Sequence, residues 1–287
     1  MALEIKNLLT ECNKQFVACK KTIVGTINDI HSMNGIGLHD NLQEKLNGEL
    51  PINRLELLEL VKSWGRDDDF YTNENIKIPE CEATQCYDLS KLDTSEITDM
   101  SQLFQFSEFN GDISNWDVSK VTDMSGLFDC AIKFNQDINS WDVSNVTNMN
   151  KMFYLAKEFN QTLDNWNVSK VTNMGSMFKG TRKFNQDISS WNVSNVKDMS
   201  GMFAEASNFN QDLNNWDVSN VIDMSLMFYN TRDFNQPLNN WYVSNVTNMA
   251  YMFGRAKSFN QALNDWDVSN VTSMGGMFFL AKEFNQA

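Results

Sequence analysis

Residues that could do acid–base or metal chemistry are few in this chain of 287 residues. It has two histidines, His31 and His39, which leaves little material for histidine-based catalysis or a histidine-rich metal site. The sequence holds no G-x-S-x-G, P-loop, G-x-G-x-x-G or H-E-x-x-H motif. The acidic run 67–69 lacks the spaced acids and closing glutamate of an EF-hand, so a solvated loop is the preferred interpretation. We therefore expect no enzymatic activity, no cofactor and no metal site.

The five cysteines give no complete disulfide framework, because an odd number cannot pair fully within one chain. Cys12 and Cys19 fall on one face of a segment with helical apolar spacing, and Cys130 occupies a variable position of a repeat. Cys81 and Cys86 could form a bridge in an oxidising compartment or remain thiols. A zinc site would need more Cys or His ligands nearby.

The aromatic residues follow a strict period of 25 residues. Seven complete units run over 109–283, and Phe284 begins an eighth. Their consensus is F-N-Q-D-[IL]-N-x-W-D-V-S-N-V-T-N-M-x-x-M-F-x-x-A-K-x, and a degenerate unit over 92–100 matches 116–124 at a spacing of 24. The tryptophans that mark the units are Trp116, Trp141, Trp166, Trp191, Trp216, Trp241 and Trp266.

A 25-residue unit cannot bury its own apolar face, so we expect the units to stack as the coils of a repeat solenoid. Numbering each unit from its Phe, mainly apolar residues occupy positions 1, 5, 8, 10, 13, 16, 19, 20 and 23, the last being Ala or Thr. The pattern predicts a short strand at positions 8–10, then a second short extended segment or tight turn of helix at positions 13–16. Positions 16–23 are predicted as a short helical or 3₁₀ segment. Parallel strands of adjacent coils would pair about 4.8 Å apart.

Two polar positions are the same in every unit, Asn at position 2 and Ser at position 11. We interpret both as structural ladders that satisfy backbone groups at turns, with a binding role as the alternative. The Trp column is interpreted as core, with an exposed aromatic track for glycans or peptides as the alternative. The ladder residues are Asn135, Asn160, Asn185, Asn210, Asn235 and Asn260, with Ser144, Ser169, Ser194, Ser219 and Ser244.

The motif W-D-V-S-N-V-T-N-M-x-x-M-F, as it stands at 141–153, resembles the 25-residue repeat of bacterial surface lipoproteins best known in mycoplasmas. It is also similar to the wider BspA-like leucine-rich-repeat family, and the resemblance covers 89–287. It implies a curved, leucine-rich-repeat-like solenoid, display at the cell surface, and adhesion to or recognition of other proteins or cells. The family implies no catalysis. Residues 1–21 are charged throughout and resemble no secretory signal peptide, so a cytoplasmic location is the alternative.

The N-terminal region carries no repeat, and its apolar spacing predicts helices over 3–30, 41–46 and 53–64. We expect a small all-α domain or cap at 1–80, since an uncovered solenoid end exposes core and strand edges. The degenerate first coil and junction then occupy 81–108, and the repeats occupy 109–287.

A formal net charge of −14 argues against a nucleic-acid partner, and no apolar stretch is long enough to span a membrane. We expect a recognition or adhesion protein with a protein or glycan partner, in an oligomeric state that the sequence leaves open. Specificity must lie at the positions that vary between units. The candidate partner surface is a group of basic residues at such positions: Lys179, Arg182, Lys183, Arg232, Arg255 and Lys257.

Two other functions fit the same sequence. The protein could be a scaffold whose N-terminal helices oligomerise while the repeats act as a spacer. Alternatively, the helical region could be an active or targeting module, with the repeats as the arm that selects its substrate.

Overall fold

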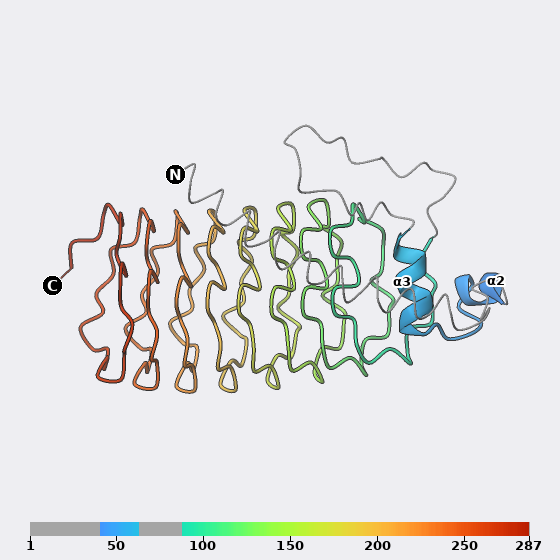
Figure 1. The fold of residues 1–287 in the computed structure, drawn as a ribbon, viewed down its shortest axis with the longest axis horizontal. Helices are drawn as coiled ribbons and strands as arrows, with labels where there is room; N and C mark the ends of the chain where they lie inside the picture. The colour runs from blue at the N-terminus through green and yellow to red at the C-terminus, as the bar shows by residue number, and fades with distance from the viewer. Residues whose placement is uncertain (1–40, 63–87, 287) are drawn as a thin grey trace.

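The computed structural model describes residues 41–62 and 88–286. Those residues include two helices, α2 (Leu42–Leu46) and α3 (Arg54–Lys62). The rest of the described chain forms a row of stacked coils, one coil for each sequence repeat (Figure 1). The helix predicted at 3–30, both histidines, the acidic run 67–69 and the Cys81–Cys86 pair lie outside the described residues.

Adjacent coils are joined through position 15 by parallel bridges of a single residue, from Asp99–Asp123 through Asn248–Ser273. At each of these bridges, the residue that follows the bridge residue donates its backbone N–H to a carbonyl of the following coil. The N–H of Met124, for example, donates to the carbonyl of Asn148 at 3.0 Å. The bridges keep the coils in register along the stack.

The strand expected at positions 8–10 is absent from the described coils. Within the coil 109–133, the N–H of Trp116 donates to the carbonyl of Ile113 at 3.1 Å. The N–H of Val121 donates to the carbonyl of Val118 at 2.9 Å. These two tight turns use, inside one coil, backbone groups that a strand would pair with its neighbour.

Positions 16–23 are not helical but form consecutive turns. The N–H of Leu127 bonds within the coil to the Met124 carbonyl at 3.2 Å, whereas the N–H of Phe128 bonds to Met152 of the next coil at 2.8 Å. Positions 18 and 22 adopt a φ near +60°, as at Gly126 (61°) and Cys130 (58°), the conformation of the third residue of a type II turn. The apolar spacing 16, 19, 20, 23 suits a helix and this run of turns equally well, which explains the difference.

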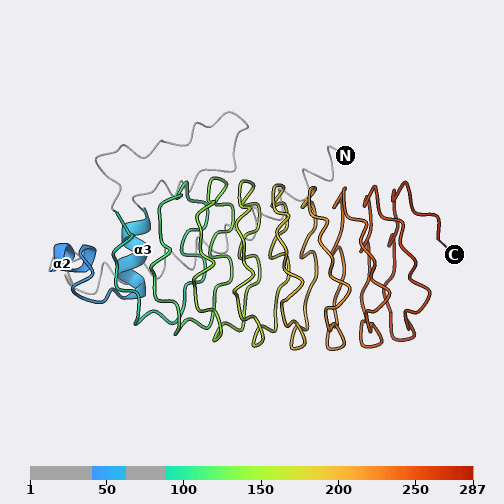
Figure 2. The same ribbon diagram turned by 180° about the vertical axis from the view of Figure 1, so that it is seen from behind.

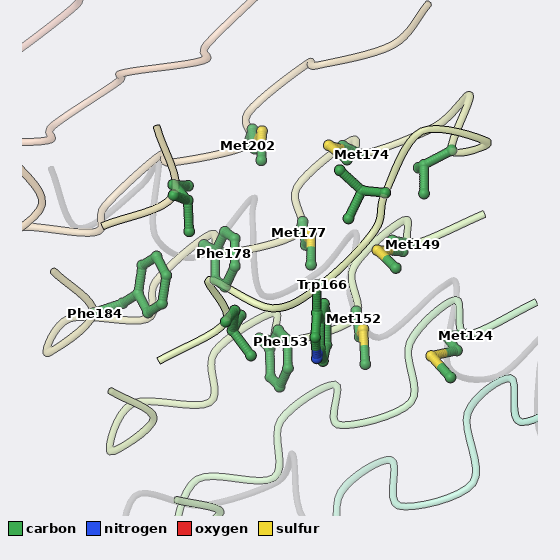
Figure 3. Packing of buried hydrophobic residues seen from close by; sticks show 14 of the residues in the cluster. Met124, Met149, Met152, Phe153, Trp166, Met174, Met177, Phe178, Phe184 and Met202 are labelled. Atoms are coloured by element: carbon green, nitrogen blue, oxygen red, sulfur yellow. The ribbon is translucent and has the colours of Figure 1, made fainter. Parts of the chain in front are cut away.

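The core consists of identical side chains stacked from coil to coil. Figure 3 shows two methionine rows beside the phenylalanines Phe153 and Phe178. The indole rings of Trp166 and Trp191 lie nearly parallel, with centroids 6.4 Å apart. The methionines labelled in the figure are Met124, Met149 and Met174 at position 16, with Met152, Met177 and Met202 at position 19.

Helix α3 packs on the first coil (Figures 1 and 2). Its start is fixed by Asn53, whose Oδ1 accepts the N–H groups of Leu55 and Glu56 while Glu56 accepts the N–H of Asn53, a capping box. Leu57 and Leu60 are fully buried and belong to the same core as the coils. The leucine-rich-repeat-like class and the division into 1–80, 81–108 and 109–287 stay predictions.

Candidate interaction surface

Charge is segregated around the coils. Between residues 109 and 283, ten of the 13 Lys and Arg occupy positions 18–25 of their units. Of the 18 Asp and Glu in the same range, 13 occupy positions 1–17. Since each position repeats once per coil, this bias gives one edge of the stack a basic character within an acidic protein.

Position 24 carries most of this charge. We call its residues in the coils from 134 to 283 the basic row: Lys157, Arg182, Ser207, Arg232, Lys257 and Lys282. All five cations of the row are exposed, and Ser207 is half-buried.

Backbone hydrogen bonds hold the basic row in line from Ser207 to Lys282. The N–H of Ser258 donates to the carbonyl of Arg232 at 3.1 Å. In the same way, the N–H of Glu283 donates to the carbonyl of Lys257 at 3.3 Å. In this part of the row, neighbouring members are therefore about one strand spacing, ~4.8 Å, apart at the backbone.

In the part of the chain that the structure describes, no acidic side chain forms an ion pair with a cation of the basic row. The Nε of Arg232 donates to the Asn230 side chain at 3.4 Å, and this partner is neutral. Like charges in a row repel one another, so the arrangement attracts an anionic group placed over it.

The residues predicted to contact a partner lie at this edge, but they make different interactions there. Arg182, Arg232 and Lys257 belong to the basic row. The ammonium of Lys179 lies 5.7 Å from the ring centre of Tyr154. Lys183 forms an ion pair with Glu158.

Arg255, the sixth predicted residue, lies with its guanidinium 5.8 Å from the ring centre of Tyr229. Lys157 and Lys282, two further members of the basic row, were missed by the sequence argument. Aligning the units at position 24 would have found them.

A second row, at position 9, is largely acidic. We call it the acidic row: Asp117, Asp142, Asn167, Asn192, Asp217, Tyr242 and Asp267. All of its members are exposed, and the ring of Tyr242 is the most exposed large hydrophobic side chain among the described residues, at 76%.

The Asp and Asn of the acidic row each close a turn. Asp142 Oδ1, for example, accepts the N–H of Ser144 at 3.0 Å, and Asn167 accepts that of Ser169 at 3.2 Å. Hydrogen bonds from the hydroxyl and N–H of Ser119 lower the pKa of Asp117. The serines at position 11 therefore serve these turns through their backbone N–H, and the hydroxyl of Ser119 donates to Asp117 as well.

Near these turns, asparagines at position 12 form hydrogen bonds between successive coils. The sequence alone did not predict this role. The Nδ2 of Asn145 donates to the carbonyl of Ser119 at 2.8 Å, and the Nδ2 of Asn195 donates to that of Ser169 at 2.7 Å.

The asparagines at position 2 link successive coils. Oδ1 of Asn160 accepts the N–H of Asn185 at 3.0 Å and a hydrogen bond from Nε2 of Gln186 at 3.1 Å. The same Asn-to-Asn bond joins each pair from Asn110–Asn135 to Asn260–Asn285.

The tryptophans face inward. From Trp116 to Trp241 they are 2–4% exposed, which leaves no aromatic track at their surface. Each indole nitrogen donates to a carbonyl of the preceding coil, as Trp191 Nε1 does to Leu163 at 2.9 Å. The indole is thus both core and a link between coils.

A carboxyl group is buried in the first coils. Asp129 is buried, and its Oδ2 accepts a hydrogen bond from Nε2 of the buried Gln105 at 2.8 Å. Loss of solvation raises the pKa of Asp129, while the bond from Gln105 and the neighbouring Cys130 thiol partly oppose the rise.

Across 41–62 and 88–286, no three His, Cys, Asp or Glu side chains gather as a metal site would require. Neither helix in those ranges combines the length and apolar character needed to cross a bilayer.

The stacked coils and repeated rows define a tandem-repeat protein with a unit of 25 residues. A family described as "Mycoplasma protein of unknown function, DUF285" matches three overlapping segments, 77–189, 158–253 and 214–287. The chain belongs to this family. No curated protein and no solved structure matches it.

Proposed function

We propose that this chain is a non-enzymatic recognition or adhesion protein, displayed at the cell surface, that binds a macromolecular partner along the basic row. The observation that carries the proposal is the alignment of five exposed cations, without acidic partners among the described residues, on one edge of an otherwise acidic stack. The partner is a protein or glycan that presents carboxylate, sulfate or phosphate groups, which Lys and Arg bind through charge-assisted hydrogen bonds.

The net charge of −14 does not prevent this interaction. At physiological ionic strength, charges are screened beyond about 8 Å, so a partner at the edge responds mainly to the nearby row. Because the backbone of the row is fixed by hydrogen bonds between coils, binding requires little ordering of the chain itself.

The scaffold alternative receives less support. Leu57, Leu60 and Val61 of α3 are buried against the first coil, so that apolar face is already occupied within the chain.

An array of immobilised proteins and glycans, probed with the labelled full-length chain, tests the proposal. The test variant is R182E/R232E/K257E, which reverses three charges of the basic row. The control variant is K120E/K170E/K197E, which makes the same change in net charge at positions 12 and 14. The proposal predicts array signals that the test variant loses and the control retains. Equal signals from both folded variants would contradict it.

A further inference from the structure

We infer that the basic row of one copy docks on the acidic row of a second copy, so that two stacks lie side by side in steps of whole coils. The inference rests on the same basic row as the proposed function, but it concerns the protein alone. It makes a second copy a competitor for the surface that the outside partner would use.

Periodicity is the first argument for a second copy as the occupant. The basic row and the acidic row both advance by one residue per coil, because hydrogen bonds lock each coil to the next. A partner whose charges have another spacing drifts out of register over several coils. A second copy necessarily has the same spacing.

The side chains of the two rows also match when two copies lie parallel with their coils aligned. Three cations of the basic row then face three acids, and the neutral Ser207 faces the neutral Asn192. The facing charges are Lys157 with Asp142, Arg232 with Asp217, and Lys282 with Asp267.

The two remaining cations also find suitable partners in this alignment. Arg182 faces the amide of Asn167, which can accept its hydrogen bonds. Lys257 faces Tyr242, whose exposed ring can bind an ammonium group over its face. The docking thus gives a role to the most exposed aromatic ring among the described residues.

The rows still match when one copy is shifted by one coil along the stack relative to the other. Lys157, Arg182 and Lys257 then face acids, and Lys282 faces Tyr242. The rows therefore favour side-by-side contact at whole-coil steps rather than a single register.

Two acids of the row are held in the charged form that the contact needs. Hydrogen bonds from Ser119 lower the pKa of Asp117, and hydrogen bonds from Ser269 lower that of Asp267. Since the basic row and the acidic row are different surfaces, the contact is heterologous and can add further copies at either side. We expect a weak, reversible and salt-sensitive association, because it consists mainly of exposed charge pairs.

Sedimentation velocity of the full-length chain tests the inference. It is measured at about 20 mM NaCl, where charge interactions are long-ranged, and at about 500 mM NaCl, where they are screened. We expect larger species that grow with protein concentration in low salt and a monomer in high salt. A monomer under both conditions would overturn the inference.

Two matched variants distinguish an effect of the acidic row from an effect of the net charge on self-association. The variant D142N/D217N/D267N removes three charges of the acidic row but keeps the turn-closing oxygen, as Asn167 and Asn192 already do. The control D112N/D137N/D187N removes three charges at position 4, where each Asp likewise accepts a backbone N–H. We expect only the first variant to be monomeric in low salt. If both variants associate alike, the acidic row is not the docking surface.

Zero-length carbodiimide crosslinking of a mixture of ¹⁵N-labelled and unlabelled copies then reads the contact directly. Crosslinks between copies should join members of the basic row to members of the acidic row, such as Lys282 to Asp267. Crosslinks between copies that involve only other positions would contradict the docking.

The outcome is distinguishable from failure of the proposed function. The variant D142N/D217N/D267N keeps the basic row, so it should retain array signals while losing self-association. Array signals from a monomeric wild type would overturn only the inference. Self-association without any array signal that depends on the basic row would overturn only the proposed function.

Discussion

Gln105 donates a hydrogen bond from Nε2 to the carboxylate of Asp129 at 2.8 Å, and both side chains are buried in neighbouring coils. The other carboxylate oxygen, Oδ1, has no hydrogen-bond partner. Burial without full hydrogen bonding disfavours the charged carboxylate relative to the neutral carboxylic acid. The pKa of Asp129 is therefore raised.

The variant D129N should therefore be more stable than the wild type at neutral pH. Because the folded pKa of Asp129 is raised, this group costs no stability at low pH, and its cost appears as pH rises from its ordinary pKa through the raised one. We expect a gain of about 1–3 kcal/mol, the scale of an unpaired buried polar group, at about pH 8. Thermal unfolding across pH measures this gain. It should vanish near pH 3, and a gain that does not depend on pH would contradict the assignment.

Removing one indole from the core should strongly destabilise the stack. Trp191 is 4% exposed, stacks on two other indoles and donates to the carbonyl of Leu163. We expect W191A to lower the free energy of unfolding by about 3–5 kcal/mol. Chemical denaturation measures the loss, and W266A, at a half-buried site, serves as the milder comparison.

The asparagine ladder should contribute through its acceptor oxygen alone. Asn185 Oδ1 accepts the N–H of Asn210 and the Nε2 of Gln211, both at 2.9 Å. Since the site is exposed, N185A should reduce stability by only about 0.5–1.5 kcal/mol. N185D keeps an acceptor oxygen and should stay near the wild type. If the two variants lose equal stability, the ladder does not act as described.

Gly180 lies at position 22, where both the backbone conformation and a neighbouring side chain disfavour an added Cβ. Gly180 has a φ of +74°, and a Cβ there would lie 2.5 Å from Cδ2 of Leu155. We expect G180A to lower the free energy of unfolding by about 1–3 kcal/mol. In contrast, G275A should be close to neutral, because a Cβ at that site meets nothing within 4 Å. Melting temperatures of the two variants provide the comparison.

The sequence predicts which side chains are buried better than it predicts the backbone between them. A period of 25 residues with fixed apolar positions leaves little choice of which side faces inward. The turns at positions 16–23 were hidden because the positive φ at position 18 falls on glycine in three coils, such as Gly126, but on other residues, such as Lys151 and Tyr251, in the remaining four. Glycine therefore does not mark the site as it would in a single turn.

The basic row was only partly visible from sequence for a different reason. Arg182, Arg232 and Lys257 stand out as basic residues, but their alignment depends on the register between coils. That register is set by backbone hydrogen bonds such as the one from Ser258 to Arg232. The ion pair of Lys183 with Glu158 also depends on it, since the two residues lie 25 positions apart.

The central claim is that the basic row is the surface that binds the partner. Its most direct test is the affinity of R182E/R232E/K257E and of K120E/K170E/K197E for the strongest partner on the array, measured by biolayer interferometry near physiological salt. We predict at least a tenfold loss for the first variant, about 1.4 kcal/mol, and a change within about twofold for the second. Equal affinities of the two variants, with both folded, would contradict the account.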